Sequence, residues 1–87
     1  MNYLSFRYCF RRMMQDGKKY KRVGWEGYWA WENNTIMIHC ADGRVLDIRE
    51  TDNVLFTIEN ALSEDWVVAV PSNCPVLARE IGGTQNA

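Results

Sequence analysis

The feature that most constrains the fold is a pair of short apolar runs joined by a tight-turn signal. Residues 35–40 (TIMIHC) are followed, after Asp42-Gly43, by residues 44–48 (RVLDI). β-Branched residues favour strands, and Asp-Gly is a preferred pair where two antiparallel strands are joined by a tight turn. The sequence therefore predicts an antiparallel hairpin over residues 35–48.

Three other segments have the composition of short strands: residues 18–23, 28–31 and 65–70. Gly24 interrupts the first segment, and turn residues at 26–27 and 32–34 bracket the second. Pro71 and Pro75 lack the backbone N–H that a sheet ladder needs, so we expect them to end regular structure. Together with the hairpin, these segments predict a small antiparallel sheet.

Two segments have helical periodicity. Within residues 4–16, apolar side chains recur at the i, i+3, i+4 and i+7 spacing of one helical face, starting at Phe6. Ser5 can cap the start of this helix, and Gly17 can adopt the left-handed conformation that ends one. Residues 55–62 predict a second, shorter helix, which follows a polar loop at residues 49–53.

The order of elements predicts an α+β fold, with an N-terminal helix packed on a small antiparallel β-sheet and a second short helix before the last strand. We expect a single domain over residues 1–87, with its core in residues 4–70 and a mixed tail over residues 71–87. In that tail Val76, Leu77 and Ile81 are apolar enough to dock, and the final GGTQNA is expected to be loose.

Length and composition exclude several classes of protein. The chain has 87 residues, of which 47% are hydrophobic and 24% charged, as in an ordinary small globular domain. It has no apolar run of about 18 residues and no signal-peptide layout at its start. We therefore expect a protein without membrane contact that is located in the cytoplasm.

Aromatic content and charge distribution suggest a binding role. Aromatic residues make up 13% of the chain and include four tryptophans, more than a core of this size usually needs. Residues 1–25 carry seven basic groups against one acidic group, whereas residues 26–87 carry three basic groups against ten acidic ones. Such asymmetry is typical of a protein that binds an anionic ligand, or of one whose two halves attract each other or a neighbouring subunit. Exposed sheet edges and aromatic surface also favour a homo-oligomer.

Catalytic and metal-binding patterns are absent from the sequence. His39 is the only histidine, and no nucleophile-base set, P-loop or Gly-rich dinucleotide motif accompanies it. Cys9, Cys40 and Cys74 have no metal-ligand spacing and fit small buried hydrophobic residues better. We expect a protein that is not an enzyme and that uses neither metal nor cofactor.

The best candidate site is the segment 18–25 (KKYKRVGW). Its cationic side chains suit phosphate, and its aromatic rings suit a stacked base. Two other interpretations remain open: a solvated basic strand with Trp25 in the core, or a nucleic-acid surface over residues 18–22. The sequence pI of about 5.7 makes a nucleic-acid partner less favourable.

The order of these motifs resembles the Thoeris anti-defence two family of phage proteins. A helix leads into Gly17-Lys18-Lys19 and then into residues 22–25 (RVGW), residues 41–43 (ADG) form a hairpin tip, and residues 61–66 (ALSEDW) lead into a last strand. The resemblance covers about residues 4–70. The chain departs from the family pattern in a shorter segment at 26–34, in residues 59–64, and in the tail beyond Pro71.

The resemblance implies a sponge that binds and sequesters a cyclic ADP-ribose isomer, the immune signal of the bacterial Thoeris defence, without cleaving it. It also implies a homotetramer with pockets between protomers, and some relatives bind cyclic dinucleotides. Adenine would stack on Trp25 or another ring, and Arg22 or a lysine would meet the pyrophosphate. Backbone N–H groups near Gly24 would add donors. For Trp66 a core position is favoured over ligand contact. The candidate ligand-binding residues are Arg22, Gly24, Trp25, Tyr28, Trp29, Asp65 and Trp66. The alternatives are a sponge for cyclic dinucleotide signals and a small inhibitor that binds protein through the aromatic residues 28–31.

Overall fold

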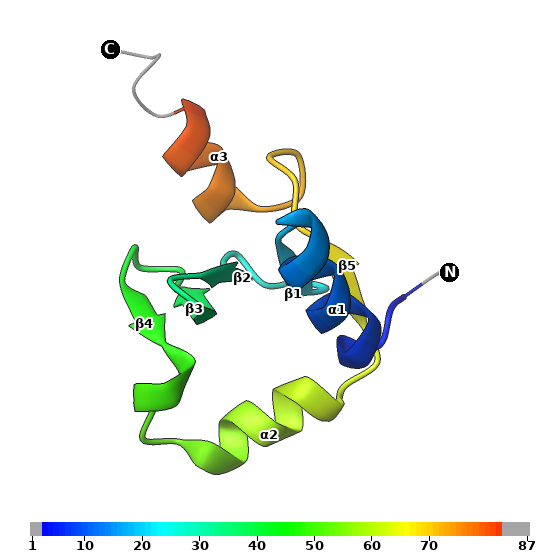
Figure 1. Cartoon of the computed structure of the whole chain (residues 1–87). Helices are drawn as coiled ribbons and strands as arrows, with labels where there is room; N and C mark the ends of the chain where they lie inside the picture. The colour runs from blue at the N-terminus through cyan, green and yellow to red at the C-terminus, as the bar shows by residue number, and fades with distance from the viewer. Residues whose placement is uncertain (1–2, 83–87) are drawn as a thin grey trace.

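The computed structural model describes residues 3–82 and has the expected α+β architecture (Figure 1). Five antiparallel strands form one sheet in the order β4-β3-β2-β1-β5. The strands are β1 (Tyr20–Arg22), β2 (Tyr28–Glu32), β3 (Thr35–His39), β4 (Val45–Asp47) and β5 (Trp66–Val68). The helices are α1 (Phe6–Asp16), α2 (Val54–Leu62) and α3 (Pro75–Gly82), and a short 3₁₀ helix, η1 (Ile48–Glu50), overlaps the start of the expected polar loop.

Helix α1 begins and ends where its capping residues predict. The Ser5 hydroxyl accepts a hydrogen bond from the Tyr8 N–H at 3.3 Å. Gly17 has φ 70°, a left-handed conformation that favours glycine, and its N–H donates to the Met13 carbonyl at 3.1 Å. The helix buries Cys9 and Met13 completely against the sheet.

Tight turns set the register of the two hairpins. Asn33 and Asn34 have φ of 54° and 62°, the doubly left-handed turn that asparagine tolerates best among the larger residues, and Glu32 pairs with Thr35 across it. In the predicted hairpin, Gly43 has φ 93° and the Cys40 N–H donates to the Arg44 carbonyl at 2.8 Å. The hairpin over residues 35–48 is confirmed.

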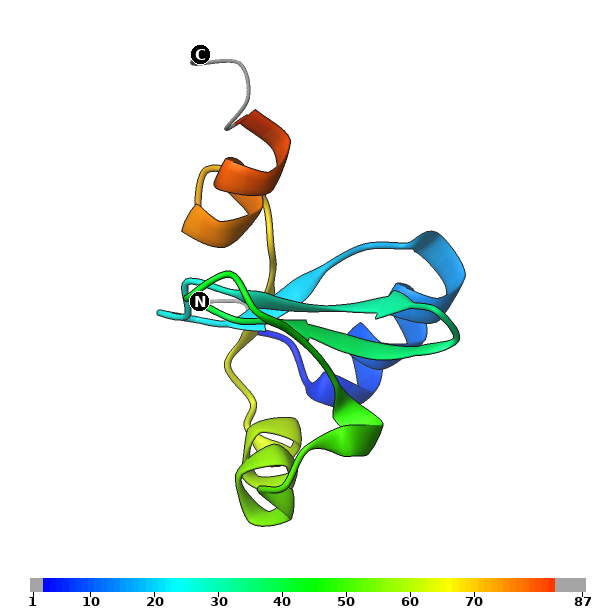
Figure 2. The same cartoon turned by 90° about the vertical axis from the view of Figure 1, so that its left-hand side faces the viewer.

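The sheet separates two apolar clusters, so the molecule has three layers. Figure 2 shows the sheet nearly edge-on, with α3 above it and α1 and α2 below it. The lower cluster is mainly aromatic and lies between the sheet and α1; its buried members are Cys9, Met13, Tyr20, Trp29, Ile36 and Trp66. The upper cluster lies under α3; its members are Tyr28, Ala30, Ala69, Cys74, Val76 and Leu77.

The expectation of a mixed tail after residue 70 is wrong for residues 75–82, which form α3. Pro75 starts this helix instead of ending regular structure, because the first helical position needs no N–H donor. Val76 and Leu77 dock as the sequence allowed, whereas Ile81 is 57% exposed. The expected loose end lies outside the described residues, apart from its first glycine, which belongs to α3.

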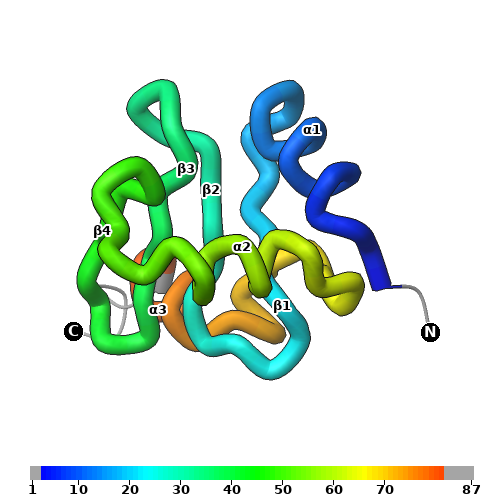
Figure 3. Tube along the Cα trace, turned by 90° about the horizontal axis from the view of Figure 1, so that it is seen from below, coloured from blue at the N-terminus to red at the C-terminus, as the bar shows by residue number. Residues whose placement is uncertain are grey.

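Helix α2 connects opposite edges of the sheet. Seen from below, it runs across the sheet from the β4 side toward the β1 and β5 side (Figure 3). Its start is capped by Asn53, whose Oδ1 accepts the Phe56 N–H at 2.9 Å. Most of its apolar side chains are exposed to solvent. The second helix before the last strand is therefore confirmed, but it covers the core less than α1 does.

Candidate functional site

An apolar groove of about 250 Å³ lies at the end of β2 and β3, on the side of α2. Trp29 belongs to β2, Ile38 to β3 and Phe56 to α2, and Trp25 lies in the loop after β1, so three elements and that loop meet there. The complete lining is Trp25, Glu26, Gly27, Tyr28, Trp29, Ile38, His39, Cys40, Ala41 and Phe56.

The Trp25 side chain packs partly against the core and is partly accessible in the groove. Gly24, with φ 88°, turns the chain after β1, and the Trp25 N–H donates to the Arg22 carbonyl at 3.1 Å. The indole packs against Trp29 and Trp66, with ring centroids 5.8 and 5.3 Å away, and it remains half-buried. The accessible part of this side chain can offer an aromatic surface to a ligand.

Gly27 allows the loop between β1 and β2 to approach β3. A Cβ atom at this position would lie 2.0 Å from the carbonyl oxygen of His39, so no other residue fits without moving the backbone. By contrast, a Cβ at Gly24 would meet nothing within 4 Å, and its glycine is required only by the positive φ. The sequence placed the backbone of Gly24 near the ligand, which stays a prediction; Gly27 is the glycine that a close contact within the chain requires.

Helix α3 fixes two backbone segments of the groove. The Glu26 carbonyl accepts the Val76 N–H at 3.0 Å and lies 3.1 Å from the Cys74 sulfur, which can donate to it. The Ala41 carbonyl accepts from Nη2 of Arg79 at 3.0 Å. Glu26 and Ala41 both line the groove, so the segment that was expected to be a tail supports the candidate site.

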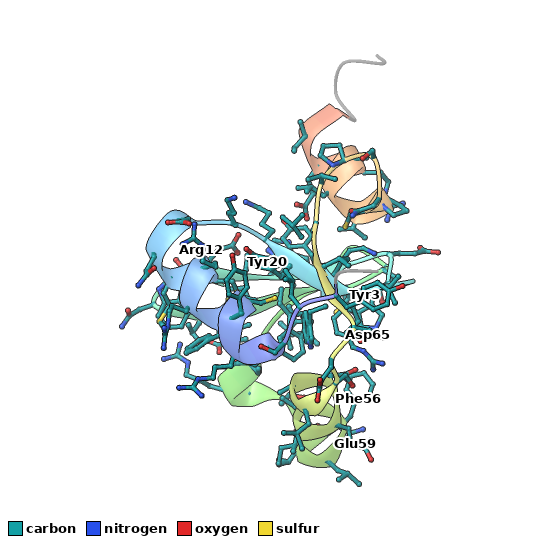
Figure 4. The ribbon with its side chains drawn as sticks, turned by 90° about the vertical axis from the view of Figure 1, so that its right-hand side faces the viewer. Tyr3, Arg12, Tyr20, Phe56, Glu59 and Asp65 are labelled. Carbon is teal, nitrogen blue, oxygen red and sulfur yellow. The ribbon has the colours of Figure 1, made fainter. Side chains whose placement is uncertain are left out.

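Arg22 and Asp65 form an ion pair that holds α2. Nε and Nη2 of Arg22 donate to the two carboxylate oxygens of Asp65 at 2.8 and 3.1 Å, and Nη1 donates to Oδ1 of Asn60 at 2.8 Å. This pairing lowers the pKa of Asp65 below its ordinary value. Figure 4 places Asp65 between α2 and the sheet. Three nitrogens of Arg22 are thus engaged within the chain, and its contact with a phosphate stays a prediction.

Two predicted ligand residues are core residues. Trp66 has no exposed surface, and its Nε1 donates to the Asn60 carbonyl at 3.0 Å. Its core position, which the sequence favoured, is confirmed. Trp29 is 2% exposed and packs between Phe6 and Trp66, so it borders the groove without offering an open ring face.

Tyr28 belongs mainly to the opposite face of the sheet. Its ring stacks on His39 with centroids 4.2 Å apart, and its hydroxyl donates to Glu80 of α3. Burial, followed by the Glu80 contact, raises the pKa of Tyr28. The other oxygen of Glu80 lies 2.8 Å from Nδ1 of His39, and Glu32 lies 2.9 Å from its Nε2. No local pattern in the sequence indicated this network, because Glu80 lies in the segment expected to be a tail.

The basic residues of the motif do not gather beside Trp25. Lys18 and Lys19 line a second groove of about 450 Å³, together with Val68, Leu77 and Ile81. Lys21 is buried, and its Nζ donates to the Arg22 carbonyl at 3.3 Å. Within one chain, the cations and the aromatic surface of segment 18–25 therefore belong to separate places.

The aromatic run at residues 28–31 provides little exposed surface. Tyr28, Trp29 and Ala30 are buried, and Trp31 is half-buried. These residues are buried because α1 covers one face of β2 and α3 covers the other. The alternative of a protein-binding inhibitor that acts through this run is therefore not favoured.

The described residues contain no cluster of three or more side chains that could hold a metal ion. The three cysteines are free, and Cys9 and Cys74 are buried as expected. Burial raises the pKa of the Cys9 thiol to about 12. Over residues 3–82, no helix has the length and apolar character needed to cross a membrane.

Comparison of the chain with family models, with curated proteins and with solved structures gives no match.

Proposed function

We propose that this protein is a sponge, which binds a cyclic ADP-ribose isomer in the cytoplasm of a bacterial host and withholds it from the defence effector without cleaving it. The observation that carries the proposal is the groove between Trp25 and Phe56. A small apolar site with an accessible indole suits the adenine end of such a ligand. The motif resemblance of residues 17–25 and 61–66 supports the same ligand class.

The size of the groove favours a site shared between copies. Pockets for drug-sized ligands commonly measure about 300–1,000 Å³, whereas this groove measures about 250 Å³. It has room for a base, but not for a ribose and a pyrophosphate in addition. We propose that the rest of the ligand is enclosed by a neighbouring protomer of a homo-oligomer, with a tetramer as the expected form.

The charges around the groove favour the same arrangement. Among the residues that line the groove, Glu26 is the only aspartate, glutamate, lysine or arginine. A pyrophosphate needs cations, and Arg22 is already paired with Asp65. Lys18 or Lys19 of a neighbouring copy can supply them, because both line an open groove elsewhere on the chain.

The proposal is tested by calorimetric titration of a cyclic ADP-ribose isomer into the wild-type protein and into Trp25→Ala. Stacking on one aromatic ring contributes about 1–3 kcal/mol per base, and about 1.4 kcal/mol corresponds to tenfold in affinity. We therefore expect Trp25→Ala to weaken binding about tenfold or more, and Trp25→Phe to weaken it less.

Tyr8→Ala is the matched control, since this aromatic side chain is 49% exposed on α1 and does not line the groove. Thermal melting of each variant separates loss of binding from loss of fold. Heating the complex should release the ligand chemically intact. Unchanged affinity in a folded Trp25→Ala protein would refute the site, and a cleaved ligand would refute the sponge.

A further inference from the structure

Helix α2 has its polarity reversed relative to an ordinary surface helix. The one buried residue of α2 is the polar Asn60, whose side chain bonds to Arg22. Val54, Ile58 and Leu62 recur at intervals of four residues, the spacing of a single helical face, and they are 60%, 49% and 74% exposed. Leu55, at 67% exposed, extends the same face. We call Val54, Leu55, Ile58 and Leu62 the α2 stripe.

From this geometry we infer that the α2 stripe is the surface through which two copies of this chain pair about a two-fold axis. The inference rests on the proposed function for the role of the oligomer, since the small groove requires a second copy. The pairing itself is argued from the stripe.

The composition of the stripe selects a second copy as its occupant. A two-fold contact brings the same residues together from both sides, so it needs a surface that does not repel itself. The stripe contains no charged residue. Within residues 52–64, which contain α2, the charged residues are all acidic (Asp52, Glu59 and Glu64), and Arg22 beside the helix is paired with Asp65. The acidic residues disfavour nucleic acid or an anionic membrane. Figure 4 labels Glu59 on α2, where it can stay solvated at the rim of a helix pair.

The size of the stripe agrees with a contact between two helices that forms part of a larger interface. Contiguous apolar patches on monomers rarely exceed about 300–600 Å², and a stable interface covers about 800 Å² on each partner. An interface of that size contains about 20–30 residues on each side, so the four residues of the stripe can form only part of one. Phe56, 54% exposed on the same helix and part of the groove lining, continues the apolar surface toward the candidate site.

Ile58 is the middle residue of α2, so in an antiparallel two-fold pair it faces its own counterpart. Ile58→Asp and Ile58→Lys should each place like charges opposite one another. We expect each variant to weaken association by about 30-fold or more, the effect of losing a central contact residue. An equimolar mixture of the two variants should recover the larger mass, because the opposite charges then meet.

Light scattering coupled to size exclusion, at micromolar concentration, measures these masses. Val45→Asp is the control, since Val45 has a similar exposure of 46% but lies on β4; it should retain the wild-type mass. Near-ultraviolet circular dichroism of the tryptophans confirms that each variant is folded.

A monomeric wild-type protein would overturn the inference, as would an Ile58→Asp variant with unchanged mass. A mixture that stays small would overturn the two-fold arrangement. Calorimetry keeps the two proposals distinguishable. A monomeric wild-type protein that binds the nucleotide leaves the proposed function standing without this interface, whereas an α2-dependent oligomer that binds no nucleotide leaves the interface without the function.

Discussion

Helices α1 and α2 lie on the same side of the sheet, but different forces hold them. Helix α1 buries Cys9 and Met13 in the aromatic cluster, so apolar contact fixes its position. Helix α2 buries only Asn60, through bonds to Arg22 and Trp66, and leaves its apolar stripe in solvent. Apolar sequence periodicity therefore identifies both helices, but it does not say whether the apolar face meets the core.

The first and largest expected effect is on the α1 side. Met13→Ala removes a fully buried side chain, which typically lowers the free energy of unfolding by about 2–5 kcal/mol. Ile58→Ala on α2 should change it by less than about 1 kcal/mol when measured on the monomer, because Ile58 is half-exposed. Urea denaturation at low protein concentration measures both values. Equal losses would show that α2 is packed as tightly as α1.

The second effect is on the polar attachment of α2. Arg22→Ala leaves Asp65 and Asn60 without their partner, and hydrogen bonds to charged groups contribute about 1.5–3 kcal/mol. We expect an unfolding free energy lower by about that amount, and faster hydrogen exchange in α2 than in α1.

Arg49→Ala is the matched control for Arg22→Ala. Arg49 also pairs with an aspartate, Asp47, but its side chain is 66% exposed, so the loss should stay within about 1 kcal/mol. Uniformly increased exchange in both helices after Arg22→Ala would contradict the separate attachment of α2.

The local elements were predictable because short-range chemistry determines them. Ser5 and Gly17 delimit α1, Asp42-Gly43 marks a hairpin, and a second tight turn joins β2 to β3, so the fold class followed from the sequence. Helix α3 was missed because Pro75 was interpreted as a terminator, and a proline serves equally well at the first position of a helix.

The candidate site was predictable only in part, because it depends on contacts between distant segments. Trp25, which was predicted to contact the ligand, lines the groove, and that contact stays a prediction; Trp66, for which a core position was favoured, is buried. The partner of Arg22 lies 43 residues away, and nothing local to Arg22 indicated that Asp65 would occupy it. Phe56 and the support from α3 likewise depend on how the elements pack, which a pattern of neighbouring residues does not record.

The smallest expected effect is a pH dependence confined to the α2 attachment. Arg22 holds the pKa of Asp65 below its ordinary value, so Asp65 binds a proton less readily in the folded chain than in the unfolded one. Its stabilising contribution is complete above the unfolded-state pKa of about 3.9 and is lost as the pH falls through the lower folded-state pKa. The Asp65 side chain is 29% exposed, so solvent screens the pair and the contribution should be at most about 1 kcal/mol.

Other carboxylates also titrate in acid, and the variant Asp65→Asn isolates this one. The difference in unfolding free energy between wild type and Asp65→Asn should shrink as the pH is lowered from 7 toward 3, with α2 amides losing protection before those of α1. If the difference in unfolding free energy stays constant over this range, the charge of Asp65 does not hold α2, and uncharged hydrogen bonds and packing contacts hold it instead.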